Sequence, residues 1–319
     1  MALALLADIG GTNTRVALAD GSVVRAASLR RYPNAEFAGL GDVLRRYLAD
    51  EGISGVDGVC VAAAGPVRDG VAVMTNLDWT IDAPLLTAAT GARRTAILND
   101  LQAQGHALGF IAPSDLKDVI AGPAQAGEAM LVVGVGTGMN AAPVHGSGAA
   151  RLVAPSECGH VSMPIRTMRD FRLAQFLATS GPHAHGFAGV EDVLAGRGLE
   201  RLYAFVTAEA GAEVTISAAE IMERLAKGEP AAQDCARLYV GILGAELGNL
   251  ALIHLPFGGI YLIGGVARAM APYFGQMGLQ VAFCDKGRFA DFMQNFRLQL
   301  VEDDFAALTG CAAYLDSLG

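Results

Sequence analysis

The chain has 319 residues and a formal net charge of −9, and 52% of its residues are hydrophobic against 17% that are charged. This composition excludes a disordered or fibrous chain and predicts a large buried core, which at this length is expected to divide into two domains. No long basic block is present, so we expect neither nucleic acid nor a membrane surface as a partner. Five scattered cysteines without a CxxC pair, and no basic stretch before the first apolar run, favour a soluble protein in a reducing compartment.

The amino-terminal region predicts three short strands, at 3–7, 16–18 and 23–27. Between the first two lies the turn Asp8-Ile9-Gly10-Gly11-Thr12, which has too little side chain to block an approaching ligand. Backbone N–H groups in such a turn can point outward together and bind an anion. We therefore expect a β-hairpin that binds phosphate.

A helix at 37–48 and buried strands at 59–64 and 95–98 complete the first predicted domain, residues 1–105. The last of these strands runs into Asn99-Asp100, and the carboxyl edge of an open α/β sheet is where ligands bind. Asp100 could accept the proton of an attacking hydroxyl as a general base, and Asn99 could bind a neighbouring hydroxyl. Asn and Asp are also favoured helix N-caps, and these two residues alone leave that alternative open.

The second predicted domain, 106–303, repeats the opening pattern: strands at 130–133 and 141–144 flank the turn Gly134-Val135-Gly136-Thr137-Gly138. Helices are predicted at 169–179, at 217–227 with a Ser217–Glu220 capping box, and at 231–253. A strand at 259–263 follows, and its glycine pair Gly264-Gly265 would form a floor for adenine and ribose. The uncharged stretch 247–267 is interpreted as buried helix, turn and core strand rather than a membrane span. A final helix within 304–319 is expected to return to the first domain.

Short polar side chains beside glycine occur at Glu157-Cys158-Gly159-His160 and at Glu191. Carboxylates and an imidazole suit a sugar, because each can distinguish donors from acceptors among its hydroxyls. A metal site is the competing interpretation, and its four candidate ligands are Cys158, His160, His183 and His185. The spacing of these residues matches no structural zinc pattern. Asp8 is expected to bind Mg²⁺ beside phosphate, unless it only bonds its own turn. Arg15 is expected to pair with a carboxylate rather than with a ligand.

The order of these motifs resembles the bacterial glucokinases of the hexokinase–actin–chaperone ATPase superfamily, over nearly the whole chain. The residues that carry the resemblance are Asp-Ile-Gly-Gly-Thr-Asn-x-Arg at 8–15, Thr75-Asn76 with Trp79, Leu-Asn-Asp at 98–100, Gly-Thr-Gly at 136–138, Glu-x-Gly-His at 157–160, Glu191 with 193–199, 258–266, and Asp-Lys-Gly-Arg-Phe at 285–289. The zinc-binding cysteine cluster of the related repressor-and-kinase group is absent from the sequence, which favours the zinc-free branch.

The resemblance implies a two-domain actin-like (ribonuclease H-like) α/β fold with a central cleft, and ATP:D-glucose 6-phosphotransferase activity with Mg²⁺. It further implies a cytoplasmic enzyme, commonly a homodimer, in which Asp100 deprotonates the 6-hydroxyl of glucose. The residues implied to bind the other hydroxyls are Asn99, Glu157, His160 and Glu191. The residues expected to contact ATP are Ala7, Asp8, Ile9, Gly10, Gly11, Thr12, Gly136, Thr137, Gly138, Gly264 and Gly265.

The chain departs from the family pattern at three places. Met139-Asn140 stands where a small, glycine-rich continuation is usual, and Ser156 and Cys158 replace glycines that flank the sugar-binding glutamate. Ser162 stands where Asp is common. These departures bear on sugar preference more than on reaction type. They motivate two alternatives, a kinase of another hexose or a catalytically impaired regulator that binds sugar and nucleotide.

Overall fold

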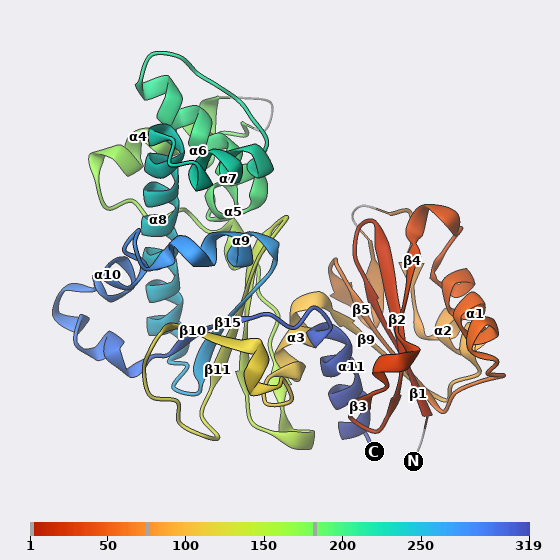
Figure 1. Cartoon of the computed structure of the whole chain (residues 1–319). Helices are drawn as coiled ribbons and strands as arrows, with labels where there is room; N and C mark the ends of the chain where they lie inside the picture. Colours follow the sequence, from red (N-terminus) through yellow and green to blue (C-terminus); the bar gives the residue numbers. More distant parts are fainter. Residues whose placement is uncertain (1–2, 75–76, 181–183) are drawn as a thin grey trace. The chain divides into compact units, whose positions relative to one another are not determined.

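The computed structural model describes residues 3–74, 77–180 and 184–319. They form two compact units, each with its own sheet and core (Figure 1). Unit 1 comprises Met1–Asp115, Gly146–Ala154 and Asp303–Gly319. Unit 2 comprises Leu116–His145 and Pro155–Glu302. The motif residues Thr75 and Asn76, and the candidate metal ligand His183, lie outside the described residues.

The main sheet of unit 1 has the strand order β3-β2-β1-β5-β9, and β4 also pairs with β2. Its strands are β1 (Leu3–Ile9), β2 (Asn13–Asp20), β3 (Val23–Val24), β4 (Arg30–Pro33), β5 (Gly58–Ala63) and β9 (Arg94–Asn99). The hairpin β1–β2 is antiparallel, whereas β1, β5 and β9 run parallel. The register aligns Ile9 with Ala63 and Ala63 with Asn99, so β1, β5 and β9 end at the same edge of the sheet.

Both faces of this sheet are covered by helices (Figure 1). Strand β1 alternates accordingly, with Leu5 and Ile9 in the core beneath α1 and α2, and Leu6 in the core beneath α3 and α11. The helices are α1 (Leu40–Glu51), α2 (Ala83–Thr90), α3 (Asp100–Ala107) and α11 (Ala306–Ser317). The remaining strands of the unit are β6 (Val67–Arg68), β7 (Val71–Val73) and β8 (Thr80–Ile81), which form a small sheet, and β13 (Leu152–Val153).

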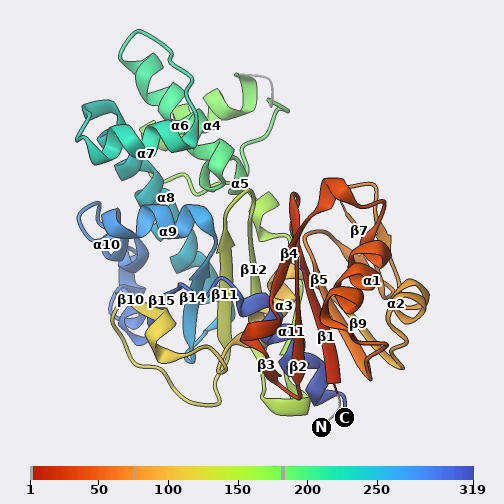
Figure 2. The same cartoon turned by 45° about the vertical axis from the view of Figure 1, so that its right-hand side comes forward.

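Strands in unit 2 follow the order β10-β15-β14-β11-β12 and can be traced side by side in Figure 2. They are β10 (Leu116–Ile120), β11 (Met130–Val135), β12 (Met139–His145), β14 (Gly259–Ile263) and β15 (Leu298–Val301). As in unit 1, an antiparallel hairpin, here β11–β12, is extended by two parallel strands, here β14 and β15. The repeat predicted from the two glycine turns is therefore present in the strand order.

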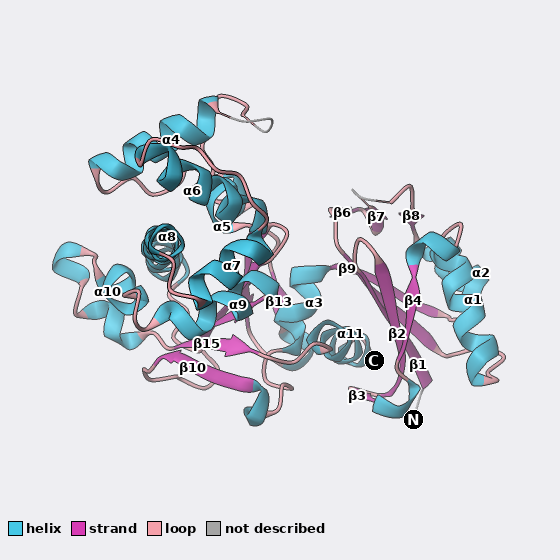
Figure 3. Ribbon diagram, turned by 45° about the horizontal axis from the view of Figure 1, so that its top comes forward, coloured by secondary structure: helices cyan, strands magenta, loops and turns pink. Residues whose placement is uncertain are grey.

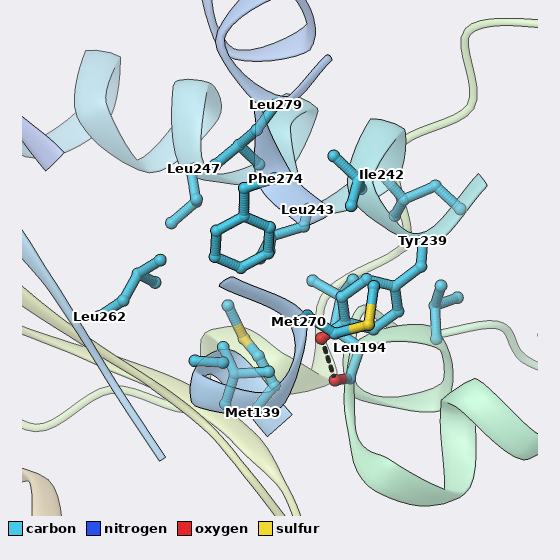
Figure 4. Packing of buried hydrophobic residues seen from close by; sticks show 14 of the residues in the cluster. Met139, Leu194, Tyr239, Ile242, Leu243, Leu247, Leu262, Met270, Phe274 and Leu279 are labelled. Carbon is cyan, nitrogen blue, oxygen red and sulfur yellow. Dashed lines mark hydrogen bonds between the residues drawn. The ribbon is translucent and has the colours of Figure 1, made fainter. Parts of the chain in front are cut away.

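Helix α8 (Pro230–His254) forms the centre of the helical layer of unit 2, with α6, α7 and α10 packed around it (Figure 3). The other helices are α4 (Met168–Thr179), α5 (Glu191–Leu194), α6 (Gly196–Glu209), α7 (Ala218–Ala226), α9 (Gly265–Phe274) and α10 (Leu279–Cys284). Figure 4 shows the core where the hydroxyl of Tyr239 donates to the carbonyl of Leu194 at 2.9 Å. Among the described residues, α8 alone has the length and apolar composition of a membrane span. Within α8, 67% of the apolar 18-residue stretch that gives it this composition is buried in the structure.

Most predicted elements are confirmed within a few residues, including both glycine hairpins and the helices near 169–179, 217–227 and 231–253. The third predicted strand is wrong beyond Val24, because Ala26–Ser28 forms a 3-10 helix in which the Ser28 hydroxyl accepts from the backbone of Leu18. Strand β4 was not predicted. The capping box of α7 is half formed: Ser217 caps the backbone of Glu220, whose own carboxylate pairs with Arg224.

Candidate active site

The first glycine turn is closed by a backbone hydrogen bond and is also held by the buried side chain of Asn34. The amide of Gly10 donates to the carbonyl of Asn13 at 3.0 Å, while Gly11 and Thr12 are exposed. Asn34, which is 2% exposed, donates its Nδ2 to the Gly10 carbonyl and accepts from the hydroxyl of Thr14, both at 2.8 Å. Asn34 was missed from the sequence, where its position after a proline indicates only a turn.

Asp8 and Arg15 face each other across the β1–β2 hairpin. The two residues are register partners, and the guanidinium of Arg15 lies 3.2 Å from Asp8 Oδ2. Burial raises the pKa of Asp8, and the charge of Arg15 opposes that rise. Arg15 thus pairs with a carboxylate, as predicted, and its partner is the residue predicted to bind magnesium.

Asn99 and Asp100 mark the junction of β9 and α3. Asn99 is the N-cap: its Oδ1 accepts from the amide of Gln102 at 2.8 Å, and the Gln102 side chain accepts in return from the amide of Asn99 at 3.2 Å. Asp100 is the first residue of α3 and is exposed, and its Oδ1 accepts from the amide of Leu101 at 2.9 Å. The capping alternative is therefore correct for Asn99, and the cap holds the backbone that presents Asp100.

The second glycine turn lies against the N-terminus of α9. The register pairs Gly134 of β11 with Ile263 of β14, so both strands end beside each other. Gly264 has φ of +103°, and a Cβ there would lie 2.3 Å from the carbonyl oxygen of Val135. A glycine is required at this position, and the structure thereby brings Gly136–Gly138 and Gly264–Gly265 to one edge of the sheet.

Glu191 is the first residue of α5 and braces this turn. Its Oε2 accepts from the amide of Met139 at 2.9 Å, and its Oε1 pairs with Arg197. A Cβ at Gly138 would lie 2.7 Å from Oε2, so the carboxylate fills the space that the glycine leaves. Arg197 was not predicted as part of the site.

Glu157 and His160 lie on a 3-10 turn that packs against β12. Both side chains are exposed, and the amide of His160 donates to the Glu157 carbonyl at 3.1 Å. Between them, Gly159 is buried, and a Cβ there would lie 2.0 Å from the carbonyl oxygen of Met139 and 3.4 Å from the Cβ of Glu191. Unit 2 therefore brings this turn next to Glu191 through the close approach of Gly159.

The competing metal site is not assembled within the described residues. No group of three or more His, Cys, Asp or Glu side chains there is arranged to hold a metal ion. His185 lies 3.5 Å from Asp192, and Cys158 lies beside the Asn140 side chain. Burial raises the pKa of the Cys158 thiol, which disfavours the thiolate that a metal would bind.

Comparisons with known proteins place these motifs in one family. A family model described as Glucokinase matches residues 5–318. The Glucokinase of Pectobacterium atrosepticum is 30% identical over 98% of this chain and 96% of its own length. The crystal structure of a glucokinase from an Antarctic psychrotroph is similar with a TM-score of 0.88 and 28% identity, covering 99% of both chains. The chain belongs to the glucokinase family, and the family resemblance and the α/β fold class predicted from the sequence are confirmed.

Some relatives are longer. The Bifunctional protein glk of Burkholderia orbicola is 31% identical over 98% of this chain but only 48% of its own length. The chain thus spans about half the length of these bifunctional relatives and nearly the whole of the Pectobacterium protein.

Proposed function

We propose that this chain is an ATP-dependent kinase that phosphorylates D-glucose at its 6-hydroxyl to give glucose 6-phosphate. The observation that carries the proposal is the shared edge of the unit 1 sheet. Because Ile9, Ala63 and Asn99 are in register on parallel strands, the first glycine turn and Asp100 follow strands only two apart, a spacing of roughly 10 Å. The turn that we propose to bind phosphate and the residue that we propose as general base therefore follow strands that end at one edge.

In unit 1, Asp100 would accept the proton of the 6-hydroxyl as that oxygen attacks the terminal phosphorus of ATP. Phosphoryl transfer needs little covalent help, so in-line positioning and neutralisation of charge are the main tasks of the protein. Gly11 and Thr12 are exposed residues whose backbone amides would serve the second task, and the buried Ala7 and Ile9 anchor their turn in the core. The Nδ2 of Asn99 would donate to a neighbouring hydroxyl, since its Oδ1 serves the helix cap.

In unit 2, Glu157 and His160 would bind other hydroxyls of glucose with their exposed side chains. We assign Glu191 two tasks: it holds Met139 through one oxygen, and it would accept a sugar hydroxyl as well. The turn Gly136–Gly138 would bind phosphate, and Gly264–Gly265, at the start of α9, would lie against adenine and ribose.

Magnesium fits the unit 1 site as the partner of ATP. Mg²⁺ is commonly held by one or two carboxylates together with substrate phosphates, and Asp8 supplies one carboxylate at the end of β1 beside the glycine turn. When bound, the ion would neutralise charge on the phosphates. Asp8 would hold it directly or through water, and Arg15 keeps this partly buried carboxylate oriented.

The proposal is tested by ADP release from the purified chain with Mg-ATP and, in separate reactions, glucose, mannose, fructose and N-acetylglucosamine. We expect glucose to give the highest kcat/KM. A higher value for another hexose would reassign the sugar, and absence of sugar-dependent release from all four would refute the kinase in favour of a regulator.

We also propose that the enzyme acts in the cytoplasm as a homodimer. Light scattering of the purified chain should then give twice its mass of 32.9 kDa. A mass of 32.9 kDa at micromolar concentration would contradict the dimer.

A further inference from the structure

Three of the positions at which this chain departs from the family pattern are in contact with one another. The side-chain oxygen of Asn140 accepts from the hydroxyl of Ser156 at 3.1 Å and from the amide of Cys158 at 3.2 Å. Its side-chain nitrogen donates to the carbonyl of Ser156 at 2.5 Å and to Glu157 Oε2 at 3.3 Å. The residues at 140, 156 and 158, where the chain departs from the family pattern, therefore belong to one hydrogen-bonded cluster.

We propose that Asn140 is a positioning residue that fixes the carboxylate of Glu157 for the sugar. The inference rests on the proposed function, because it assumes that Glu157 binds a hydroxyl of glucose. Glu157 is exposed, and an exposed glutamate samples several rotamers unless a partner restrains it. With Oε2 accepting from Asn140, a hydroxyl that donates to Glu157 is directed to Oε1.

The chemistry of the contact requires an amide at position 140. The Asn140 oxygen accepts from the Ser156 hydroxyl, the Cys158 amide and the Ala141 amide, while its nitrogen donates to two oxygens. An aspartate would keep the acceptor but lose the donor, and it would place a second negative charge beside Glu157. Glycine or alanine would remove both functions and leave Glu157 Oε2 without this donor, while the Ser156 hydroxyl would still bond to the Ala141 carbonyl of β12 at 2.6 Å.

Met139, which precedes Asn140 and also departs from the family pattern, has a different role. The residue is 2% exposed, and its side chain belongs to the unit 2 core (Figure 4). Position 139 therefore serves packing, and the effect on the sugar belongs to position 140.

The test compares Asn140→Ala and Asn140→Asp with the unmodified chain, measuring initial ADP release while glucose and ATP are varied separately. We expect the KM for glucose to rise about tenfold for Asn140→Ala, with kcat and the KM for ATP changed less than threefold. Asn140→Asp should raise the KM for glucose further, because of the charge beside Glu157. Asn295→Ala is the matched control, since Asn295 donates to one backbone carbonyl of unit 2 outside the site.

A double-mutant cycle separates positioning from general structural damage. In a Glu157→Ala background, Asn140→Ala should change the KM for glucose less than twofold, because the side chain through which Asn140 acts is then absent. The same factor in both backgrounds, or an unchanged KM for glucose in the single variant, overturns the inference while the kinase assignment stands. If Asn140→Ala does not fold, Ser156→Ala, which removes the hydroxyl that contacts the Asn140 oxygen and the Ala141 carbonyl, is taken through the same cycle with the same criteria. Absence of glucose-dependent ADP release by the unmodified chain overturns the proposed function and this inference together.

Discussion

Side chains at this site serve more than one purpose. Glu191 braces the second glycine turn through the amide of Met139 and pairs with Arg197, although the sequence indicated only a sugar ligand. Asn99 likewise caps α3. Substituting either residue will therefore change local structure as well as ligand contacts, whereas Asp100 offers a cleaner test of chemistry.

Asp100→Asn should reduce kcat by at least two orders of magnitude, because the amide cannot accept the proton of the attacking hydroxyl. The amide oxygen can still accept from the Leu101 amide, so the start of α3 and the affinity for glucose should be retained. ADP release gives kcat, and calorimetric titration with glucose gives the affinity. Turnover close to that of the unmodified chain would refute Asp100 as the base.

Asn34→Ala should weaken ATP binding without removing any group expected to touch ATP. The change leaves the half-buried Gly10 carbonyl without its side-chain donor and the buried Thr14 hydroxyl without its acceptor, at a cost of about 2 kcal/mol in the free energy of unfolding. The KM for ATP should rise more than the KM for glucose. Urea unfolding and steady-state kinetics measure the two effects, and an unchanged KM for ATP would show that the turn does not depend on this support.

At the scale of elements, the helix that begins with Asp100 depends on a close contact with α11. A Cβ added at Gly310 of α11 would lie 1.7 Å from the carbonyl oxygen of Ala103 in α3. Backbone oxygen cannot rotate away as a side chain can, so the two helices would have to separate. The position of the proposed base is therefore coupled to a residue distant from it in the sequence.

Gly310→Ala should lower the free energy of unfolding by about 3 kcal/mol and reduce kcat, because α3 moves together with Asp100. Gly241→Ala is the matched control, since Gly241 lies in α8 and its added Cβ would have no atom within 4 Å apart from its chain neighbours and the backbone of its own helix. Helix propensity alone predicts that the control is stabilised by up to about 1 kcal/mol. Equal effects of the two substitutions on stability and kcat would contradict the close-contact explanation.

At the scale of the whole molecule, His106 should make stability depend on pH. Burial, assisted by the charge of Arg151, lowers the pKa of His106 to about 4, below the unfolded value of roughly 6.5. Its contribution to stability is therefore complete above pH 6.5 and is lost as pH falls toward 4, because the unfolded chain then binds the proton more readily. Arg151 also donates to the carbonyls of His106 and Leu108 at the end of α3.

His106→Gln is the test of this pH dependence. In urea unfolding between pH 7 and pH 5, the unmodified chain should lose more stability than the variant. The difference in free energy of unfolding between the unmodified chain and the variant should therefore become smaller as the pH falls from 7 to 5. Parallel loss of stability in both proteins would exclude His106 as the source.

Local patterns in the sequence were sufficient to predict the two hairpins and most of the helices. Strand β1 was predictable because apolar residues such as Leu5 and Leu6 occupy both faces of a short run. Strand β4, Arg30–Pro33, was not predictable, because polar residues and a proline are atypical of a strand and its pairing with β2 is a tertiary contact. The glycine turns and Asp100 were identified from their motifs.

The supporting residues of the site were not identified from the sequence, for a common physical reason. Asn34, Arg197 and Asn140 act through hydrogen bonds whose partners are set by how loops pack, and no spacing in the sequence specifies such partners. The departure at Asn140 was noticed from the family pattern. That it reaches Glu157 required the structure.

Unit 1 is assembled from stretches that a ribosome produces at very different times. Helix α3 and the sheet emerge early, whereas α11, which covers Leu6, Cys60 and Ala62 on one face of that sheet, is made after all of unit 2. On the growing polypeptide this apolar face therefore stays open while the intervening domain is synthesised, a period in which exposed apolar surface invites aggregation. A nascent chain halted at 302 would carry the proposed base on a helix without its packing partner.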